Sequence, residues 1–245
     1  MPRPHHALGY ALVLLLSGAL SGCSGSEPSS SPSSTEASAP SSEPASDPSP
    51  ATPKPTGPGL QGMLLPDAAL PGLNEQAGWR TVRTSKGEPE RPRWVCQRFS
   101  LVSNGAVNAV QRSFESTKGN ATAAQVIART VDQRSAKRLF AVLVANAREC
   151  AEQLQSIDRT PRRAVQPLSM VRVPGGGQAA WGVVLSGPVR GQPDSVYIDA
   201  VAVVQVKATV SVMSMSSIGQ DYDHEPGRSP PELAIPLVAS ALGAS

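Results

Sequence analysis

The sequence has 245 residues and is 40% hydrophobic, but only nine residues are aromatic and 24 are Pro. Ser and Pro are unevenly distributed, with a dense cluster before residue 60, which excludes one globule of uniform composition. Residues 60–245 remain as one predicted folded domain. The formal net charge of +3 is small, and no part of the sequence indicates a particular reaction.

Residues 1–22 are predicted to be a lipoprotein signal peptide. Arg3 gives a weakly basic start, and the apolar run over residues 7–16 is shorter than the ~20 residues that cross a bilayer. The tetrapeptide Leu-Ser-Gly-Cys that ends at Cys23 resembles the bacterial lipobox, in which the Cys thiol receives a diacylglycerol. Cys23 is therefore the predicted lipidation site, and two acyl chains would hold the protein on the outer face of the plasma membrane. The alternative is an ordinary signal peptide with a Cys nearby by chance.

The segment that follows is predicted to be a disordered linker. Residues 24–59 contain 12 Ser and 9 Pro, and no aromatic residue, Val, Ile, Leu or Met. Such a composition cannot form a hydrophobic core. Together with Cys23 these residues form a spacer, residues 23–59, between the membrane and the domain. A plain linker is favoured over one that carries O-linked sugar.

The domain begins with a run of cations. Residues 60–245 carry a formal charge of +5, and six cations lie in the first 40 of these residues: Arg80, Arg83, Lys86, Arg91, Arg93 and Arg98. One interpretation is a basic face toward anionic lipid or wall polymer. The favoured alternative is a solvated loop, because Glu88 and Glu90 interrupt the run. No series of aromatic residues accompanies the cations, so nucleic acid is not an expected partner.

The next segments are predicted to be strands and one long helix. Trp94 to Leu101 is strand-like, and residues 106–115 and 121–131 favour a hairpin slightly over a helix. A helix is predicted from an N-cap at Asp132, because apolar residues then recur at steps of three and four as far as Leu154.

The C-terminal part is rich in Val and predicts three antiparallel strands at residues 178–186, 195–206 and 209–218. In the last of them the alternation changes phase between Val212 and Met213, which is typical of a bulge. Residues 230–242 predict a closing helix with Pro in its first turn, kinked at Pro236. The fold class is α+β, with an antiparallel sheet of about five to six strands, one long amphipathic helix and a C-terminal helix.

Two cysteines remain once Cys23 is assigned to lipid. An even pair outside the cytoplasm predicts a disulfide between Cys96 and Cys150 rather than two free thiols. Neither has a His neighbour, so they do not indicate a zinc site. No metal or other cofactor is expected.

Catalytic motifs are not found in the sequence. His224 is the only His in the domain, and it lies in a cluster with Asp221, Asp223 and Glu225. The carboxylates suggest a divalent cation, but the spacing is not that of a calcium loop, and a solvated acidic loop is favoured. No nucleophile elbow, phosphate loop or His-Glu-x-x-His motif occurs. The expected protein is not an enzyme.

Several features together resemble the actinobacterial sensor-domain lipoproteins and the PknH-like extracytoplasmic sensor domain of a mycobacterial serine/threonine kinase. The resemblance covers about residues 62–243 and rests on Leu64-Leu65-Pro66-Asp67, Cys96, residues 105–114, the helix that ends near Cys150, the Val-rich hairpin and the final helix. It implies a twisted antiparallel sheet flanked by helices and a cleft for an unidentified ligand, with no catalytic residues. The cysteines of this domain allow one disulfide, whereas the sensor domain of the kinase has two.

The favoured function is therefore a lipid-anchored, extracytoplasmic, non-catalytic domain that binds a small molecule, lipid or cell-wall fragment. The first alternative is a protein-interaction module at the cell envelope, which would present an exposed apolar patch without a pocket. The second is a secreted hydrolase, which would need His224 or a pair of carboxylates to face a cleft.

Overall fold

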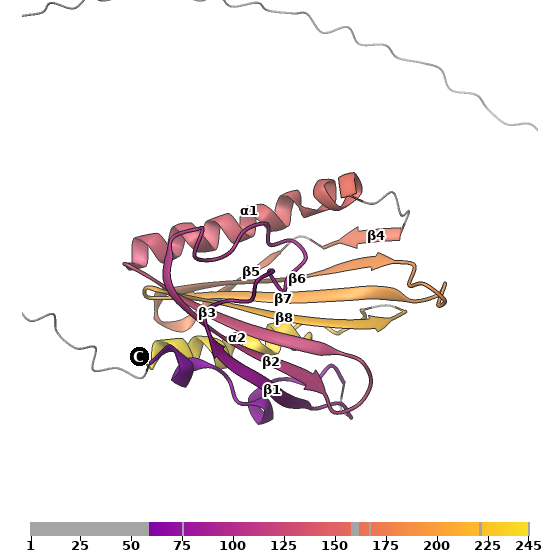
Figure 1. Ribbon diagram of the computed structural model, residues 1–245, viewed down its shortest axis with the longest axis horizontal. Helices are drawn as coiled ribbons and strands as arrows, with labels where there is room; N and C mark the ends of the chain where they lie inside the picture. The colour runs from indigo at the N-terminus through magenta and orange to yellow at the C-terminus, as the bar shows by residue number, and fades with distance from the viewer. Residues whose placement is uncertain (1–58, 75, 158–161, 167, 221, 245) are drawn as a thin grey trace, which may run out of the picture. The chain divides into compact units, whose positions relative to one another are not determined.

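The computed structural model describes residues 59–244 except residues 75, 158–161, 167 and 221. The predicted signal peptide, Cys23 and all of the linker except Gly59 lie outside the described residues. The described part contains one antiparallel sheet and two α-helices (Figure 1). The elements are η1 (Leu60–Met63), η2 (Asp67–Ala69), β1 (Trp79–Lys86), β2 (Ala106–Ser116), β3 (Thr122–Thr130), α1 (Gln133–Ile157), β4 (Arg162–Val165), β5 (Ser169–Val173), η3 (Pro174–Gly176), β6 (Gly177–Gly187), β7 (Val196–Val206), β8 (Thr209–Gly219) and α2 (Pro230–Gly243).

The sheet has eight strands, so the predicted number of five to six was too low. Their order is β1-β2-β3-β8-β7-β6-β4, and β5 also pairs with β6. The missed strands β1, β4 and β5 all lie at the two edges of the sheet. An edge strand needs no apolar alternation, and seven of the eight residues of β1 are exposed or only partly buried. The α+β class and the antiparallel pairing agree with the prediction.

The predicted hairpin is confirmed, since β2 and β3 pair from Glu115 opposite Thr122 to Ala106 opposite Thr130. The predicted strand from Trp94 to Leu101 is wrong: this segment lies in a loop. Trp94 and Leu101 are each 1% exposed and hold the loop against the domain. These two residues are hydrophobic because each one anchors the loop in the core, and not because they belong to a strand.

The predicted bulge in β8 is also wrong. Its pairing with β7 is continuous from Thr209 to Gly219. The apparent change of phase arises because both faces of β8 are buried, with Val210 and Val212 in one core cluster and Met213 and Met215 in another. A strand that is covered on both faces shows no apolar alternation.

Helix α1 begins as the sequence predicts. The Ser135 amide donates a hydrogen bond of 2.6 Å to Oδ1 of Asp132, which is the N-cap interaction. Its apolar stripe packs over β7, β8 and β3, and Leu139, Phe140 and Leu143 are almost completely buried. The helix thus covers one face of the sheet.

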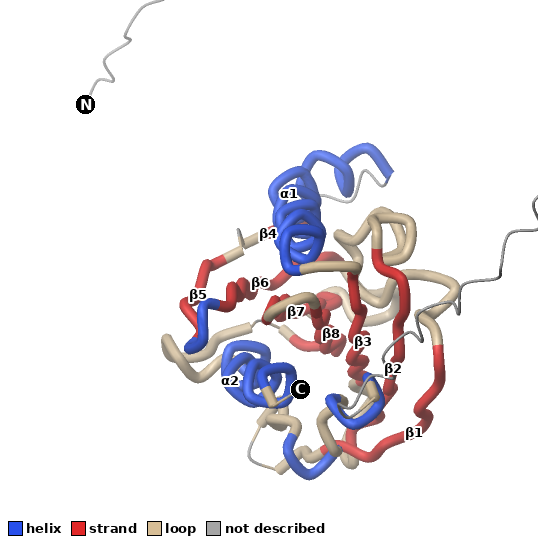
Figure 2. Tube along the Cα trace, turned by 90° about the vertical axis from the view of Figure 1, so that its left-hand side faces the viewer, coloured by secondary structure: helices blue, strands red, loops and turns tan. Residues whose placement is uncertain are grey.

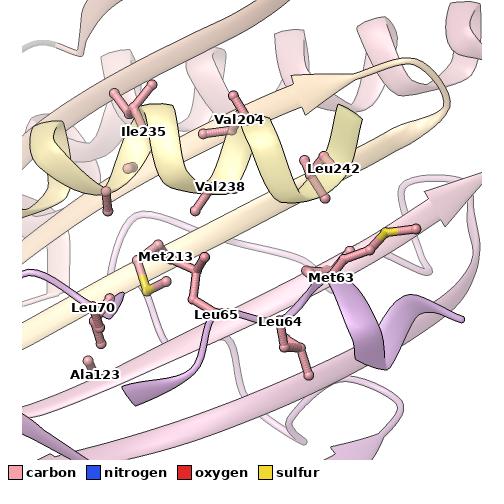
Figure 3. Packing of buried hydrophobic residues seen from close by; sticks show 14 of the residues in the cluster. Met63, Leu64, Leu65, Leu70, Ala123, Val204, Met213, Ile235, Val238 and Leu242 are labelled. Atoms are coloured by element: carbon pink, nitrogen blue, oxygen red, sulfur yellow. The ribbon is translucent and has the colours of Figure 1, made fainter. Parts of the chain in front are cut away.

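Helix α2 covers the other face. It starts at Pro230 and continues through Pro236, whose ring is exposed. Its buried residues Ile235, Val238 and Leu242 pack above Met213 of β8 and Leu65 of the N-terminal segment (Figure 3). The sheet curves around α2, and α1 lies on its opposite, convex side (Figure 2). Each face therefore has its own hydrophobic core.

The motif at residues 64–67 is part of the concave core. Leu64 and Leu65 are each 5% exposed, and the Leu65 amide donates a 2.8 Å hydrogen bond to Oε1 of the buried Gln125. Asp67 Oδ2 accepts a hydrogen bond of 2.9 Å from the Thr81 amide of β1. Hydrogen bonding to the charged form, first from Thr81, lowers the pKa of the Asp67 carboxyl. This motif fixes the N-terminal segment in the fold.

Among the described residues, no helix has the length and apolar composition required to cross a membrane.

Candidate functional site

The convex face of the sheet is covered unevenly. Helix α1 packs against β7, β8 and β3, whereas residues 87–105 form a long loop beside β1 and β2. A cavity of about 550 Å³ lies between the first part of this loop and the two strands. Ligand pockets in proteins have volumes of ~300–1,000 Å³, so this cavity is of suitable size.

Six of the eleven residues that line the cavity are charged. Four cations contribute to it, Arg83 and Lys86 from β1 and Arg91 and Arg93 from the loop, against two carboxylates, Glu88 and Glu90. All four cations are exposed, and among the described residues none of them forms an ion pair. An excess of unpaired positive charge in a concave surface attracts anions.

The carboxylate of Glu88 lines the cavity and is held in place by two backbone amides from the far end of the loop. Oε2 accepts a hydrogen bond of 2.7 Å from the Leu101 amide, and Oε1 accepts one of 2.9 Å from the Val102 amide. These bonds tie the start of the loop to its far end. Four cations against two carboxylates leave the lining with a formal charge of +2, and β1 contributes as many cations, Arg83 and Lys86, as the loop does with Arg91 and Arg93.

A second cavity of about 230 Å³ adjoins the first, and Arg93 and Ser113 line both. We call the two cavities together the convex groove, the larger being the basic part and the smaller the hydroxyl part. The hydroxyl part lies over β2, β3 and β8 and is lined by Ser113, Thr122, Ser214 and Ser216. These side chains alternate with residues that point into the concave core, as strand geometry requires.

The loop that walls the groove is held at several points. Gly87 starts it with a φ of 79°, and its amide donates to the carbonyl of Ala109 at 2.8 Å. In the middle of the loop, a disulfide joins Cys96 to Cys150 of α1, with a Cα–Cα distance of 5.2 Å. This bridge agrees with the predicted pairing and connects the groove wall to the long helix. An ion pair of 3.1 Å between Arg98 and Glu149 lies beside it.

Asp199 of β7 provides a further contact between the loop and the sheet. Its Oδ2 accepts a hydrogen bond of 2.8 Å from the Val95 amide, and its Oδ1 accepts one of 3.0 Å from the Ser216 hydroxyl. Burial raises the pKa of Asp199 to about 6, while the two hydrogen bonds act in the opposite direction. A partly buried carboxylate therefore lies directly beside Ser216 of the hydroxyl part, on the neighbouring strand β7.

The structure separates the six cations that the sequence places together. Arg83, Lys86, Arg91 and Arg93 line the basic part of the groove. By contrast, Arg80 pairs with Glu115 at 3.0 Å, and Arg98 pairs with Glu149. The favoured interpretation, a solvated loop of ordinary charges, misses the cavity that four of these cations line.

The acidic cluster around His224 forms no site among the described residues. The ring of His224 packs edge-on against Tyr222, with 4.5 Å between ring centroids. Asp223 and Glu225 are exposed, and Asp221 lies outside the described residues. Within the part of the chain that the structure describes, no group of three or more His, Cys, Asp or Glu side chains is placed to hold a metal ion.

Sequence reasoning missed the hydroxyl part of the groove. Ser113 and Ser214 are about one hundred residues apart in the chain, and they meet only because β3 pairs with both β2 and β8. The short run Met-Ser-Met-Ser at residues 213–216 of β8 carries a signal for it, since there small polar residues alternate with large apolar ones. That signal does not show which strands lie beside β8.

Comparison with solved structures gives a weak likeness in fold. A crystal structure of the extracellular domain of PknH from Mycobacterium tuberculosis aligns with 76% of this chain and 95% of that chain, at 9% sequence identity and a TM-score of 0.43. No family model matches the sequence, and no curated protein matches it. Likeness at this level carries neither a function nor site residues from one protein to the other.

Proposed function

We propose that this protein is a lipid-anchored, extracytoplasmic lipoprotein whose domain binds an anionic ligand in the convex groove and catalyses no reaction. The observation that carries the proposal is the cavity of about 550 Å³ lined by four cations that form no ion pair among the described residues. The ligand is a small molecule, a lipid headgroup or a fragment of the cell wall that carries negative charge.

Two further features support binding over catalysis. His224, the only His of the domain, packs on Tyr222 and does not line the groove. The loop that forms the wall is fixed by a disulfide and by the carboxylates of Glu88 and Asp199. A fixed wall lowers the entropy cost of binding, because the backbone of the loop does not have to be ordered by the ligand.

The test of ligand binding is native mass spectrometry of the full chain, purified in detergent from an actinobacterial host. We expect an excess mass that denaturation releases. The double variant Arg91→Gln, Arg93→Gln should lose it. The matched control Arg134→Gln, Arg148→Gln removes two exposed arginines from α1 and should keep it. The proposal fails if the wild type carries no excess mass, or if the groove variant carries as much as the control.

The proposed anchor has a separate test. Replacing the predicted lipidation residue, Cys23→Ala, should move the protein from the membrane fraction to the medium, since two acyl chains contribute most of the membrane affinity. Ligand binding by the released protein should be unchanged. A variant that stays in the membrane fraction would contradict lipid anchoring through Cys23 and leave the groove proposal intact.

A further inference from the structure

The two parts of the convex groove differ in chemistry. The basic part presents four cations, whereas the hydroxyl part presents the side chains of Ser113, Thr122, Ser214 and Ser216. A hydroxyl both donates and accepts hydrogen bonds, so a surface of several hydroxyls complements another group of hydroxyls. Arg93 lines both parts and lies at their junction.

Negative charge beside the hydroxyl part disfavours an anion there. Glu115 lines this cavity and forms an ion pair with Arg80 of the edge strand β1. Asp199 lies beside it on β7 and accepts a hydrogen bond from the Ser216 hydroxyl. Carboxylates repel a phosphate or carboxylate ligand but accept hydrogen bonds from neutral hydroxyl groups. The charged group of a ligand therefore belongs in the basic part, and a neutral hydroxylated group belongs in the hydroxyl part.

The hydroxyl part also has unused hydrogen-bonding capacity. Within the described part of the chain, the hydroxyls of Ser113, Thr122 and Ser214 take part in no side-chain hydrogen bond. Ser214 is only 4% exposed, so its hydroxyl faces this small cavity and little else. The Ser214 hydroxyl is not one of the buried side-chain atoms without a partner in the described residues, so it is open to water or a ligand in this cavity.

We propose that the groove recognises a phosphorylated polyol or sugar, with the phosphate in the basic part and the hydroxyl groups over β2, β3 and β8. The proposal rests on the proposed function, since it specifies the ligand class of the same site. Arg93 would contact the ligand where its charged and neutral portions join. The compound is either a soluble sugar phosphate or the headgroup of a phospholipid that carries a polyol.

The experiment is calorimetric titration of the full chain in detergent with inorganic phosphate, glycerol phosphate, inositol monophosphate and glucose phosphate. At least one phosphorylated polyol should bind about tenfold more tightly than inorganic phosphate, which corresponds to one or two additional hydrogen bonds. The double variant Ser113→Ala, Ser214→Ala should lose this gain and keep the affinity for inorganic phosphate. The matched control Ser217→Ala, on the opposite face of β8, should keep both.

The outcomes separate this inference from the proposed function. If phosphate binds and none of the three polyol phosphates binds more tightly, the polyol inference is overturned and the anion site stands. If none of the four probes binds, both fail. Vesicles that contain phosphatidylinositol distinguish the two sources when they are mixed with the Cys23→Ala protein, which lacks the proposed acyl anchor. Displacement of this protein by free inositol monophosphate shows a lipid headgroup in the groove, and tight binding of soluble probes without vesicle binding shows a soluble ligand.

Discussion

The two faces of the sheet are built from the same strands but differ in how they are covered. On the concave face, α2 and the N-terminal segment bring Leu65, Met213 and Ile235 into one continuous core. On the convex face, α1 covers only part of the strands, and a loop stands beside it over a polar groove. The difference shows that both faces contribute a hydrophobic core, whereas only the convex face leaves part of its strands open beside a polar groove, which is the site of the proposed binding.

The largest expected effect is on the concave face. Ile235→Ala should lower the free energy of unfolding by about 4 kcal/mol, because it removes a side chain that is 2% exposed and leaves a cavity. Chemical denaturation measures this loss. Ile218→Ala, which changes an Ile that is 43% exposed, is the matched control and should cost less than about 1 kcal/mol. Affinity for phosphate should be unchanged in both variants. A loss of affinity in Ile235→Ala would contradict the idea that the concave core and the proposed binding site on the convex face are independent.

The disulfide should affect both stability and binding. The double variant Cys96→Ala, Cys150→Ala should lower the free energy of unfolding by about 3 kcal/mol, since the bridge closes a loop across a sequence separation of 54. It should also weaken phosphate binding, because the middle of the groove wall is released from α1. Calorimetry on the folded variant measures the second effect. Unchanged affinity would show that the bridge serves stability alone.

Asp199 predicts a dependence of stability on pH. Its pKa of about 6 lies above the ordinary value of 3.8, so the folded state binds this proton more tightly than the unfolded state. Protonation therefore stabilises the fold, and the free energy of unfolding should fall by about 2 kcal/mol as pH rises from about 4 through 6.

Asp199→Asn should remove this dependence of the unfolding free energy on pH. Asp194→Asn, a change at an exposed position, should keep it. Denaturant unfolding at a series of pH values measures the difference. Equal slopes in the wild type and in Asp199→Asn would show that the contact between the loop and β7 does not titrate in this range.

The smallest effect distinguishes two glycines with the same conformation. Gly87 and Gly119 both have a φ of 79°, and no atom would contact an added Cβ within 4 Å at either position. Substitution by Ala should cost about 1 kcal/mol of unfolding free energy in each case, because the left-handed conformation is unfavourable with a side chain. Only Gly87→Ala should weaken phosphate binding, since Gly87 starts the loop that walls the groove. Equal affinities would contradict that role.

The sequence predicts the elements in which the surroundings of each face, core or solvent, stay the same along the whole element. The stripe of α1, the N-cap at Asp132 and the long strands β6, β7 and β8 follow directly from spacing and composition. The pair Cys96 and Cys150 follows from the expected compartment. In these cases local pattern and tertiary contact agree.

The remaining features depend on contacts between distant segments. Strand β1 is exposed along most of its length and carries no apolar pattern, so only its pairing with β2 defines it. Trp94 resembles a strand residue but anchors a loop. The groove joins Arg93 of the loop to Ser214 of β8, and no spacing in the sequence indicates that they share a cavity. The cationic run is visible in the sequence, where a solvated loop is the favoured interpretation, and only the topology shows that four of its residues line a cavity.

The most direct test of the central claim is a two-dimensional amide NMR titration of the full chain with inorganic phosphate. Binding in the convex groove predicts that the largest shifts occur in residues 83–93 and 111–113, that amides of α2 are unaffected, and that Arg91→Gln with Arg93→Gln abolishes the shifts. Shifts that are absent, or that are strongest around Arg134 and Arg148 on α1, would contradict an anion site in the groove.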